Sequence, residues 1–206
     1  GYTKSPTPIL FCEAESIFVA PFFLMEFVEG AIIRNKVPQG MLLGKQEFEK
    51  LSRSAVDCLV ELHQLELVQA GLIQLSKPEG FTQRQVTGWV ERYFRAKTKE
   101  IPELENAAIW LQENIPSTEY TAFIHNDFKY DNLVLDPADP CSIRSVLDWE
   151  MATIGNPLMD LGTTLAYWAE ESDPEILKLF NLSHLPGNLT REELMDYYFT
   201  KAAGSK

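Results

Sequence analysis

Hydrophobic positions along the chain change their spacing several times, and each change predicts a different kind of element. The first thirty residues are rich in strand-forming side chains, and they predict two or three consecutive strands at 9–12, 17–20 and 22–28. From about Lys45 to Leu65 the apolar positions recur every three or four residues, which indicates a long amphipathic helix. The N-terminal part is therefore expected to consist of strands followed by a helix.

Two further helices are expected in the middle of the chain. The first spans about Thr82 to Lys97, and the second follows Pro102 and reaches about Ile115. Each has apolar residues every three or four positions along one side, which is typical of a helix that packs against a core. We therefore expect both helices to face the interior of the protein.

Short apolar segments return after these helices. Residues 121–125 are strand-like and lead into a polar cluster. Residues 132–136 and 142–149 are then separated by Asp136-Pro-Ala-Asp-Pro140, a dense group of turn-forming residues. Two strand-like segments joined in this way predict a β-hairpin.

The chain after the hairpin is expected to be mostly helical. Asn156 followed by Pro157 fits the start of a helix, because Asn caps the first turn and Pro suits its first position. Asp173-Pro174 is expected to begin another helix. Thr190 and Glu193 have the spacing of a capping box, so the final helix is expected to begin there.

The composition is that of a globular protein with an acidic surface. The chain has 206 residues, 45% of them hydrophobic, and its 30 Asp and Glu against 18 Lys and Arg give a formal net charge of −12. This length can bury a core without disulfides. The excess of acids argues against a nucleic-acid partner, because phosphate backbones are held by clustered Lys and Arg. It also disfavours strongly anionic substrates, although net charge cannot specify a pocket.

Three features predict a cytoplasmic location. Cys12, Cys58 and Cys141 are odd in number and lack metal-ligand spacing, which fits a reducing compartment. The most apolar run, 16–28, is too short and too interrupted to cross a bilayer. Residues 1–8 lack the basic-then-apolar order of a signal peptide. We therefore expect no membrane partner.

Two polar clusters carry candidate chemistry. The first contains Asp127 and Asn132, and the second contains Asp148 at the end of the predicted hairpin. Because a hairpin brings its two ends together, these three side chains are expected around a common point. Carboxylate and carboxamide oxygens suit Mg²⁺, which binds through carboxylates and substrate phosphates. The sequence therefore predicts a site for a metal and a phosphate.

The spacing H-x-D-x-x-x-x-N, followed by an aspartate after a hairpin, is how protein kinases place a hydroxyl nucleophile and hold Mg-ATP. Here the sequence has His-Asn-Asp at 125–127 and Asp-Trp-Glu at 148–150, in place of His-Arg-Asp and Asp-Phe-Gly. This combination resembles the aminoglycoside phosphotransferase and choline kinase family, which shares the kinase fold and phosphorylates small-molecule hydroxyls. The subgroup related to the kinase-like domain fused to some acyl-CoA dehydrogenases is similar in more detail, at Leu62 to Leu65, Lys77 to Gln85 with Trp89, Asn126 to Asn132, and Asp148 to Pro157.

The resemblance implies an α+β, protein-kinase-like fold. Residues 1–30 would hold the last strands of the N-lobe and the hinge, and residues 31–206 the helical C-lobe with the catalytic loop and the hairpin. A complete fold of this kind also has a glycine-rich loop, a strand lysine and a helix glutamate, and the residues before Leu24 are too few to hold them. We therefore expect most of the N-lobe to be absent from this chain, which is either part of a longer enzyme or a natural short form.

The resemblance also assigns roles in catalysis. It implies Asp127 as the catalytic base, which accepts or orients the acceptor hydroxyl proton. It implies Asn132 and Asp148 as Mg²⁺ ligands, Lys129 opposite the transferred phosphate, and Glu150 in the water shell of the metal. Such a base need not be strong, because alignment and charge neutralisation carry most of phosphoryl transfer.

Four other residues are expected to support this site. His125 and Asp160 would brace the catalytic loop from behind. In the predicted hinge, the Glu26 carbonyl and the Val28 amide would meet the adenine edge, because an extended backbone offers an acceptor and a donor two residues apart.

These observations predict an ATP- and Mg²⁺-dependent phosphotransferase that phosphorylates a hydroxyl group of a small molecule. Two other functions stay open: a non-catalytic pseudokinase that binds a nucleotide or a partner, and a metal-dependent phosphohydrolase that uses Asp127 and Asp148. By resemblance the acceptor can be a hydroxylated acyl compound as well as an aminoglycoside. The oligomeric state is not predicted.

Overall fold

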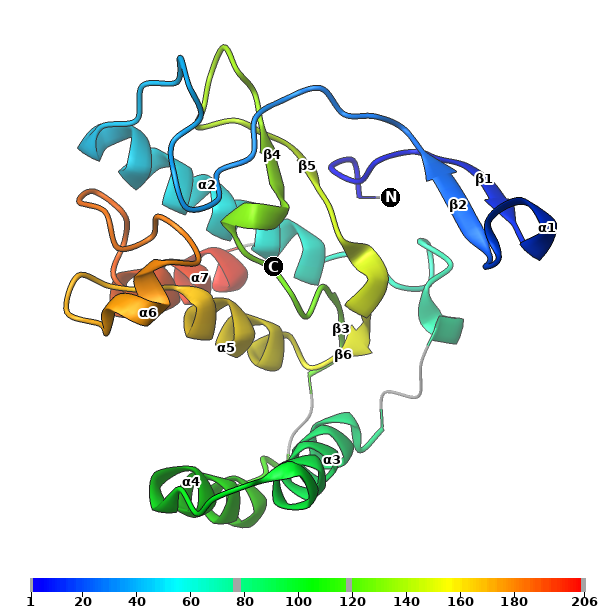
Figure 1. Ribbon diagram of the computed structural model, residues 1–206, viewed down its shortest axis with the longest axis vertical. Coiled ribbons are helices and arrows are strands. Elements are labelled where there is room, and N and C mark those ends of the chain that lie inside the picture. The colour runs from blue at the N-terminus through cyan, green and yellow to red at the C-terminus, as the bar shows by residue number, and fades with distance from the viewer. Residues whose placement is uncertain (1, 76–78, 118–119, 205–206) are drawn as a thin grey trace.

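The computed structural model describes residues 2–75, 79–117 and 120–204 (Figure 1). Its helices are α1 (Glu15–Phe18), α2 (Lys45–His63), α3 (Phe81–Ala96), α4 (Pro102–Glu113), α5 (Pro157–Tyr167), α6 (Glu175–Lys178) and α7 (Arg191–Ala203), with the 3₁₀ turns η1 (Ile73–Leu75), η2 (Tyr130–Asn132) and η3 (Trp149–Met151). Its strands are β1 (Pro8–Cys12), β2 (Phe22–Met25), β3 (Ala122–Ile124), β4 (Leu133–Leu135), β5 (Ile143–Val146) and β6 (Thr153–Gly155). These strands form three antiparallel pairs: β1 with β2, β3 with β6, and β4 with β5.

Most of the expected elements lie near their predicted positions. The helices α2, α3 and α4 confirm the three helices expected before the hairpin, and α5, α6 and α7 confirm the three expected after it. The predicted caps are also present: Asn156 accepts a hydrogen bond from Leu158 N at 3.0 Å, and Thr190 and Glu193 form a capping box. The expected mixture of helices and strands is therefore confirmed.

Three details of the strand prediction are wrong. Residues 17–20 do not form a strand, because the connection between β1 and β2 must reverse direction and contains α1, which Val19 ends in a left-handed conformation (φ 61°). The strand predicted at 22–28 ends at Met25. The pattern also does not predict β6.

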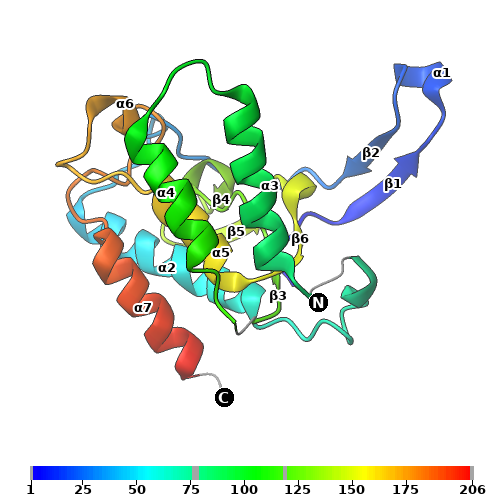
Figure 2. The same cartoon turned by 90° about the horizontal axis from the view of Figure 1, so that it is seen from below.

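The core-facing orientation expected for α3 and α4 is wrong as well. The two helices pack side by side and stand apart from the rest of the protein (Figures 1 and 2). Trp89 on α3 and Trp110 on α4 are 60% and 61% exposed, whereas Phe81 at the start of α3 is buried. Two amphipathic helices that contact mainly each other cannot cover the whole of both apolar stripes, so part of the α3 stripe faces outward.

The main hydrophobic core lies between α2, the β4–β5 hairpin, α5 and α7. The helices α2 and α7 contact each other along their length, and α2 also contacts β5 and β3. Fully buried members of this core come from each element: Leu51 and Leu59 from α2, Leu133 from β4, Val146 from β5, Leu161 from α5 and Leu194 from α7. This packing fixes the two strand pairs that carry the polar loops.

Strand register places the polar clusters at one end of these pairs. The loop 125–132 leaves β3 and enters β4, and Leu133 is paired with Val146 on β5. The Leu147 amide donates a hydrogen bond to the Asn132 carbonyl at 2.8 Å, so Asp148 follows directly beside Asn132. The hairpin therefore brings the backbones of the two clusters together, while the common point expected for the three side chains stays a prediction.

A close approach at Gly155 holds the start of α3 against the β3–β6 pair. An added Cβ at Gly155 would lie 2.5 Å from Cε1 of Phe81 and 2.6 Å from Cδ1 of Ile124. Gly155→Ala is therefore expected to lower the free energy of unfolding by about 1–3 kcal/mol, because both side chains would have to move. Urea denaturation measures this change.

Gly162→Ala is the matched control. Gly162 is an exposed residue of α5, and in the described structure no atom beyond its chain neighbours and its own helix backbone lies within 4 Å of its added Cβ. This change is expected to stabilise the protein by up to about 1 kcal/mol, because Ala favours the helix. Equal effects of the two substitutions would contradict tight packing at Gly155.

The β1–β2 hairpin extends away from the body of the protein (Figure 1). The chain returns to the body through Ala31, which forms a bridge with Leu135 of β4 through hydrogen bonds of 2.9 and 2.8 Å. Among the residues that the structure describes, no helix has the length and apolar character needed to cross a membrane. The predicted boundary between two parts at residue 30 stays a prediction.

Candidate active site

Asp160 anchors the start of the polar loop. Its carboxylate is fully buried and accepts hydrogen bonds from the backbone amides of His125 at 2.7 Å and Asn126 at 2.8 Å. It also contacts His63 Nε2 at 3.1 Å, and His63 Nδ1 lies 2.7 Å from the Tyr198 hydroxyl. Residues of α2, α5 and α7 therefore hold the loop from behind, and His63 and Tyr198 are members of this brace that the sequence pattern does not identify.

His125 fixes the loop from inside as a neutral imidazole. Its Nδ1 accepts a hydrogen bond from the Asp127 amide at 3.2 Å, and its Nε2 donates to the Leu147 carbonyl at 2.8 Å. This pair of contacts places the single ring proton on Nε2. Burial lowers the pKa of His125. The hydrogen bond to the Leu147 carbonyl and the nearby carboxylates act in the opposite direction, but burial has the larger effect. The ring connects the loop to the end of β5.

Asp127 is held between a cation and an amide. Its carboxylate accepts hydrogen bonds from Lys129 Nζ at 2.9 Å and from Asn132 Nδ2 at 3.0 Å. Asn132 Nδ2 also donates to the Asp127 carbonyl at 2.8 Å, so the carboxamide oxygen of Asn132 is left for another ligand. Burial disfavours the charged form of Lys129, but the hydrogen bond and charge of Asp127 outweigh it and raise the Lys129 pKa. Lys129 also lies 4.7 Å from the ring centre of Tyr167.

Asp148 lies at the end of the hairpin in a left-handed conformation, with φ 66° and ψ 56°. This conformation is unusual for a residue other than glycine and costs about 1 kcal/mol. Asp148 and Glu150 both line a cavity of about 460 Å³ that lies under the β1–β2 hairpin, with Phe23 and Met25 on the opposite wall. Leu147, which precedes Asp148, bonds to both His125 and Asn132, so the backbone before Asp148 lies against the loop.

The structure places the predicted hinge residues just beyond β2. The Glu26 carboxylate accepts hydrogen bonds from the Thr7 hydroxyl at 2.8 Å and amide at 3.2 Å, which lowers the Glu26 pKa. In the described part of the chain no hydrogen bond engages the Glu26 carbonyl or the Val28 amide. Neither residue lines the 460 Å³ cavity, so their contact with adenine stays a prediction.

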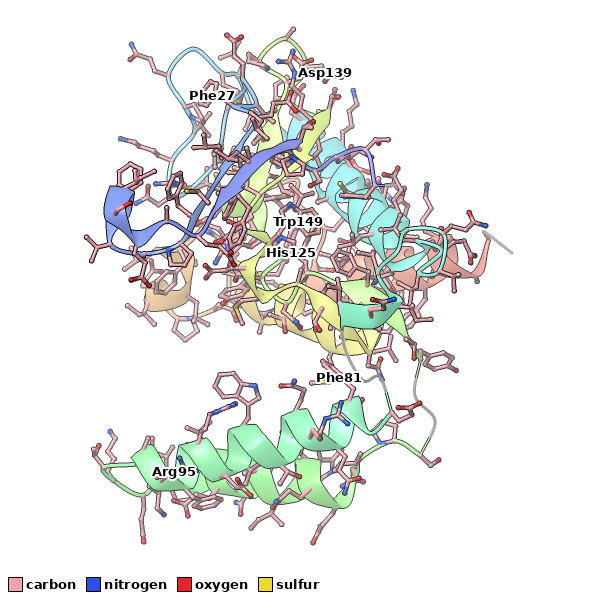
Figure 3. The ribbon with its side chains drawn as sticks, turned by 90° about the vertical axis from the view of Figure 1, so that its right-hand side faces the viewer. Phe27, Phe81, Arg95, His125, Asp139 and Trp149 are labelled. Atoms are coloured by element: carbon pink, nitrogen blue, oxygen red, sulfur yellow. The ribbon has the colours of Figure 1, made fainter. Side chains whose placement is uncertain are left out.

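A second, larger cleft of about 820 Å³ opens on the other side of the loop. It lies between α3 and the segments that carry the polar clusters, and Figure 3 shows Phe81 at the start of α3 pointing toward them. Its lining residues are Phe81, Arg84, Gln85, Trp89, Arg92, Asn126, Met151, Thr153, Met159, Thr163 and Tyr167. The spacing of apolar residues predicts the α3 helix. Because that spacing also led us to expect α3 to face the core, the cleft along it was not predicted. Lys77 and Pro78, the start of one motif, lie outside the described residues.

The arrangement of helices, hairpin and loop is that of the protein-kinase-like phosphotransferases. The chain is similar to a solved structure of a putative aminoglycoside phosphotransferase from Ralstonia eutropha, with a TM-score of 0.82, 25% identity, and coverage of 98% of this chain and 61% of that chain. A choline/ethanolamine kinase family protein from Mesorhizobium loti has the same fold, with a TM-score of 0.53, 16% identity, and coverage of 95% and 56%. Residues 2–194 match the family described as "Phosphotransferase enzyme family". The chain belongs to this family.

Curated relatives confirm the expected subgroup. Over 195 residues the chain is 33% identical to "Acyl-CoA dehydrogenase family member 11" of Rattus norvegicus, with coverage of 94% of this chain and 25% of the relative. The Homo sapiens protein of the same name is 32% identical over 194 residues, with coverage of 94% and 24%. The chain thus spans about a quarter of the length of these relatives. The expected absence of most of the N-lobe is not confirmed.

Proposed function

We propose that this chain carries the catalytic loop of an ATP- and Mg²⁺-dependent phosphotransferase that phosphorylates a hydroxyl group of a small molecule. The observation that carries the proposal is that the contacts of Asp127 reach residues next to two cavities. On one side Asn132 donates to the Asp127 carboxylate, and its carbonyl accepts from the amide of Leu147, which precedes the cavity-lining Asp148. On the other side Asn126 and Tyr167 line the larger cleft, and Tyr167 interacts with the Asp127 carboxylate.

The donor set near Asp148 fits a magnesium ion that is shared with a nucleotide. In the residues described here, no three His, Cys, Asp or Glu side chains meet as a metal cluster. Mg²⁺ commonly uses only one or two protein oxygens and completes its shell with water and substrate phosphates. The Asn132 carboxamide oxygen and the Asp148 carboxylate would be the pair that holds the ion here. When bound, Mg-ATP supplies the phosphoryl group and neutralises the charge that develops during its transfer.

The chain's own residues perform the remaining steps. Asp127 orients the acceptor hydroxyl and takes its proton as the hydroxyl oxygen bonds to phosphorus and the bond to the leaving ADP breaks. Lys129 keeps its proton because its pKa is raised, so it lies beside the reaction as a fixed positive charge. The Asp160 and His125 contacts hold the loop, which limits the reorganisation needed during transfer.

Known relatives support the ligand classes of this proposal. One solved structure with the same fold is named as a streptomycin–ATP ternary complex of an aminoglycoside phosphotransferase, and another as a GDP complex. The test is ADP production with a panel of hydroxylated acceptors, with and without Mg²⁺. ADP that forms only when acceptor and Mg²⁺ are both present supports the proposal. Nucleotide binding without phosphorylation of any acceptor would favour a pseudokinase.

Asp148→Asn is expected to raise the Mg²⁺ concentration needed for half-maximal turnover by at least about tenfold, because the ion loses a charged ligand. Mg²⁺ titrations of ADP production measure this shift. Asp139→Asn, at the far turn of the same hairpin (Figure 3), is the matched control and should leave the titration unchanged. Superimposable curves for the wild type and Asp148→Asn would remove Asp148 from the metal site.

A further inference from the structure

One face of α3 forms a wall of the 820 Å³ cleft. Phe81, Gln85, Trp89 and Arg92 follow one another at intervals of four, four and three residues, and all line the cleft. This spacing puts them on one side of a helix, and Arg84 lies on the adjacent row. The exposed part of the α3 stripe is therefore the surface that a ligand in the cleft would meet.

The charge of this wall is opposite to the charge of the protein. Arg84 and Arg92 line the cleft, and none of its lining residues in the described structure is Asp or Glu, so the wall carries +2. The whole chain carries −12. Within a cleft the nearest charges dominate, because low-dielectric walls focus their field and salt screens charges beyond about 8 Å. Asp127 adds little net charge here, because Lys129 neutralises it at 2.9 Å.

The two arginines are anchored beside apolar surface. Arg92 stacks over the Trp89 ring at 4.9 Å, which holds its guanidinium next to an indole that is 60% exposed. Arg84 donates a hydrogen bond to the Glu79 carbonyl at the start of α3. Across the cleft, Met151 and Met159 present thioether side chains. A positive rim beside an apolar floor suits a ligand that has an anionic group and an apolar part.

We infer that the cleft selects acceptors that carry an oxyanion, a phosphate or a carboxylate, next to an apolar segment, with Arg84 and Arg92 as the residues that determine this specificity. The inference rests on the proposed function, because it takes the cleft beside Asp127 as the acceptor site. It reverses the expectation from net charge that anionic substrates are disfavoured. A polycationic acceptor would approach two guanidinium groups, and none of the described residues that line the cleft is Asp or Glu.

The test compares three probes with the same aromatic skeleton: 2-naphthyl phosphate, 2-naphthoate and protonated 2-naphthylmethylamine. Isothermal titration measures their dissociation constants for the wild type, Arg84→Glu/Arg92→Glu and Arg84→Gln/Arg92→Gln. Arg95→Glu is the matched control, because it makes the same charge reversal on α3 at a residue that does not line the cleft (Figure 3). Circular dichroism and thermal denaturation verify that each variant is folded.

The wild type and Arg95→Glu are expected to bind at least one anionic probe more tightly than the ammonium probe. The double Glu variant should lose at least tenfold in affinity for that anion and gain affinity for the ammonium probe, and the double Gln variant should lie between. The tighter anion identifies phosphate or carboxylate as the preferred group. The inference would be overturned if the wild type bound neither anion or preferred the ammonium probe. It would also be overturned if the double Glu variant bound the anion as tightly as the wild type does.

Turnover separates this inference from the proposed function. Anion-selective binding without ADP production from any hydroxyl acceptor would reject the phosphotransferase but leave the ligand class of the cleft in place. ADP production with cationic acceptors alone would support the phosphotransferase but reject the anionic ligand class of the cleft.

Discussion

Asp127→Asn is expected to lower the rate of phosphoryl transfer by about 10²–10⁴-fold, because the amide cannot take the acceptor proton. The fold should be preserved, since Asn has the same shape as Asp and the Asp127 side chain is not fully enclosed, with 13% of it exposed. The Asn side chain also loses the charge that pairs with Lys129 at 2.9 Å, so Lys129 should become more mobile. The measurement is the initial rate of ADP production at saturating ATP and Mg²⁺, together with the KM for the acceptor.

Asp139→Asn provides the control for this substitution. Asp139 lies in the turn between β4 and β5 and only caps the Cys141 amide at 3.2 Å, so its rate should equal that of the wild type. A role of Asp127 in the chemical step predicts a fall in kcat with a small change in acceptor KM. A changed KM with unaltered kcat would instead assign Asp127 to binding.

The sequence is most informative where chemistry depends on local spacing. Asp127 and Asn132 are separated by one short loop, and Asp148 follows a hairpin whose turn residues define its ends. The contact of Asn132 with Asp127, and the approach of the backbone before Asp148 to Asn132, could therefore be predicted from local rules alone. The resemblance also predicts that Asp160 braces the loop. In the structure two backbone amides of the loop donate hydrogen bonds to the Asp160 carboxylate.

Features that depend on distant packing could not be predicted in this way. An amphipathic stripe shows that one side of α3 is apolar, but it does not distinguish a core from the wall of an open cleft. Only the structure shows that Trp89 and Arg92 line the same cleft as Met151 and Met159. The contact of His63 with Tyr198 joins residues 135 positions apart, and no local pattern encodes such a pair.

The two cavities together define the geometry of the proposed transfer. The smaller cavity is lined by two carboxylates, which suits a nucleotide only when a cation is shared with its phosphates. The larger cleft is lined by Arg84 and Arg92, so the anionic acceptor inferred above would need no cation there. In the proposed transfer the loop from His125 to Asn132 would lie between donor and acceptor, so its position would set the distance between them.

Asp160→Asn is expected to lower the free energy of unfolding by about 2–5 kcal/mol, because a buried acceptor is replaced by a group that also donates. The Asp160 carboxylate accepts from two backbone amides, at 2.7 and 2.8 Å, and contacts His63 at 3.1 Å. An Asn side chain has one oxygen, so at least one buried donor would face the Asn amide group. Small domains have only about 5–15 kcal/mol of stability, so this loss is large. Urea denaturation followed by circular dichroism measures it.

Asp57→Asn is the surface counterpart that tests this reasoning. Asp57 pairs with Lys201 at 2.9 Å, but both side chains are substantially exposed, so its loss should cost less than about 1 kcal/mol. The folded fraction of Asp160→Asn should also lose activity, because the amides of His125 and Asn126 set the position of Asp127. Equal stability of the two variants would mean that Asp160 is not the brace of the loop. If Asp160→Asn lowers stability but its folded fraction keeps the full kcat, Asp160 stabilises the fold without affecting catalysis.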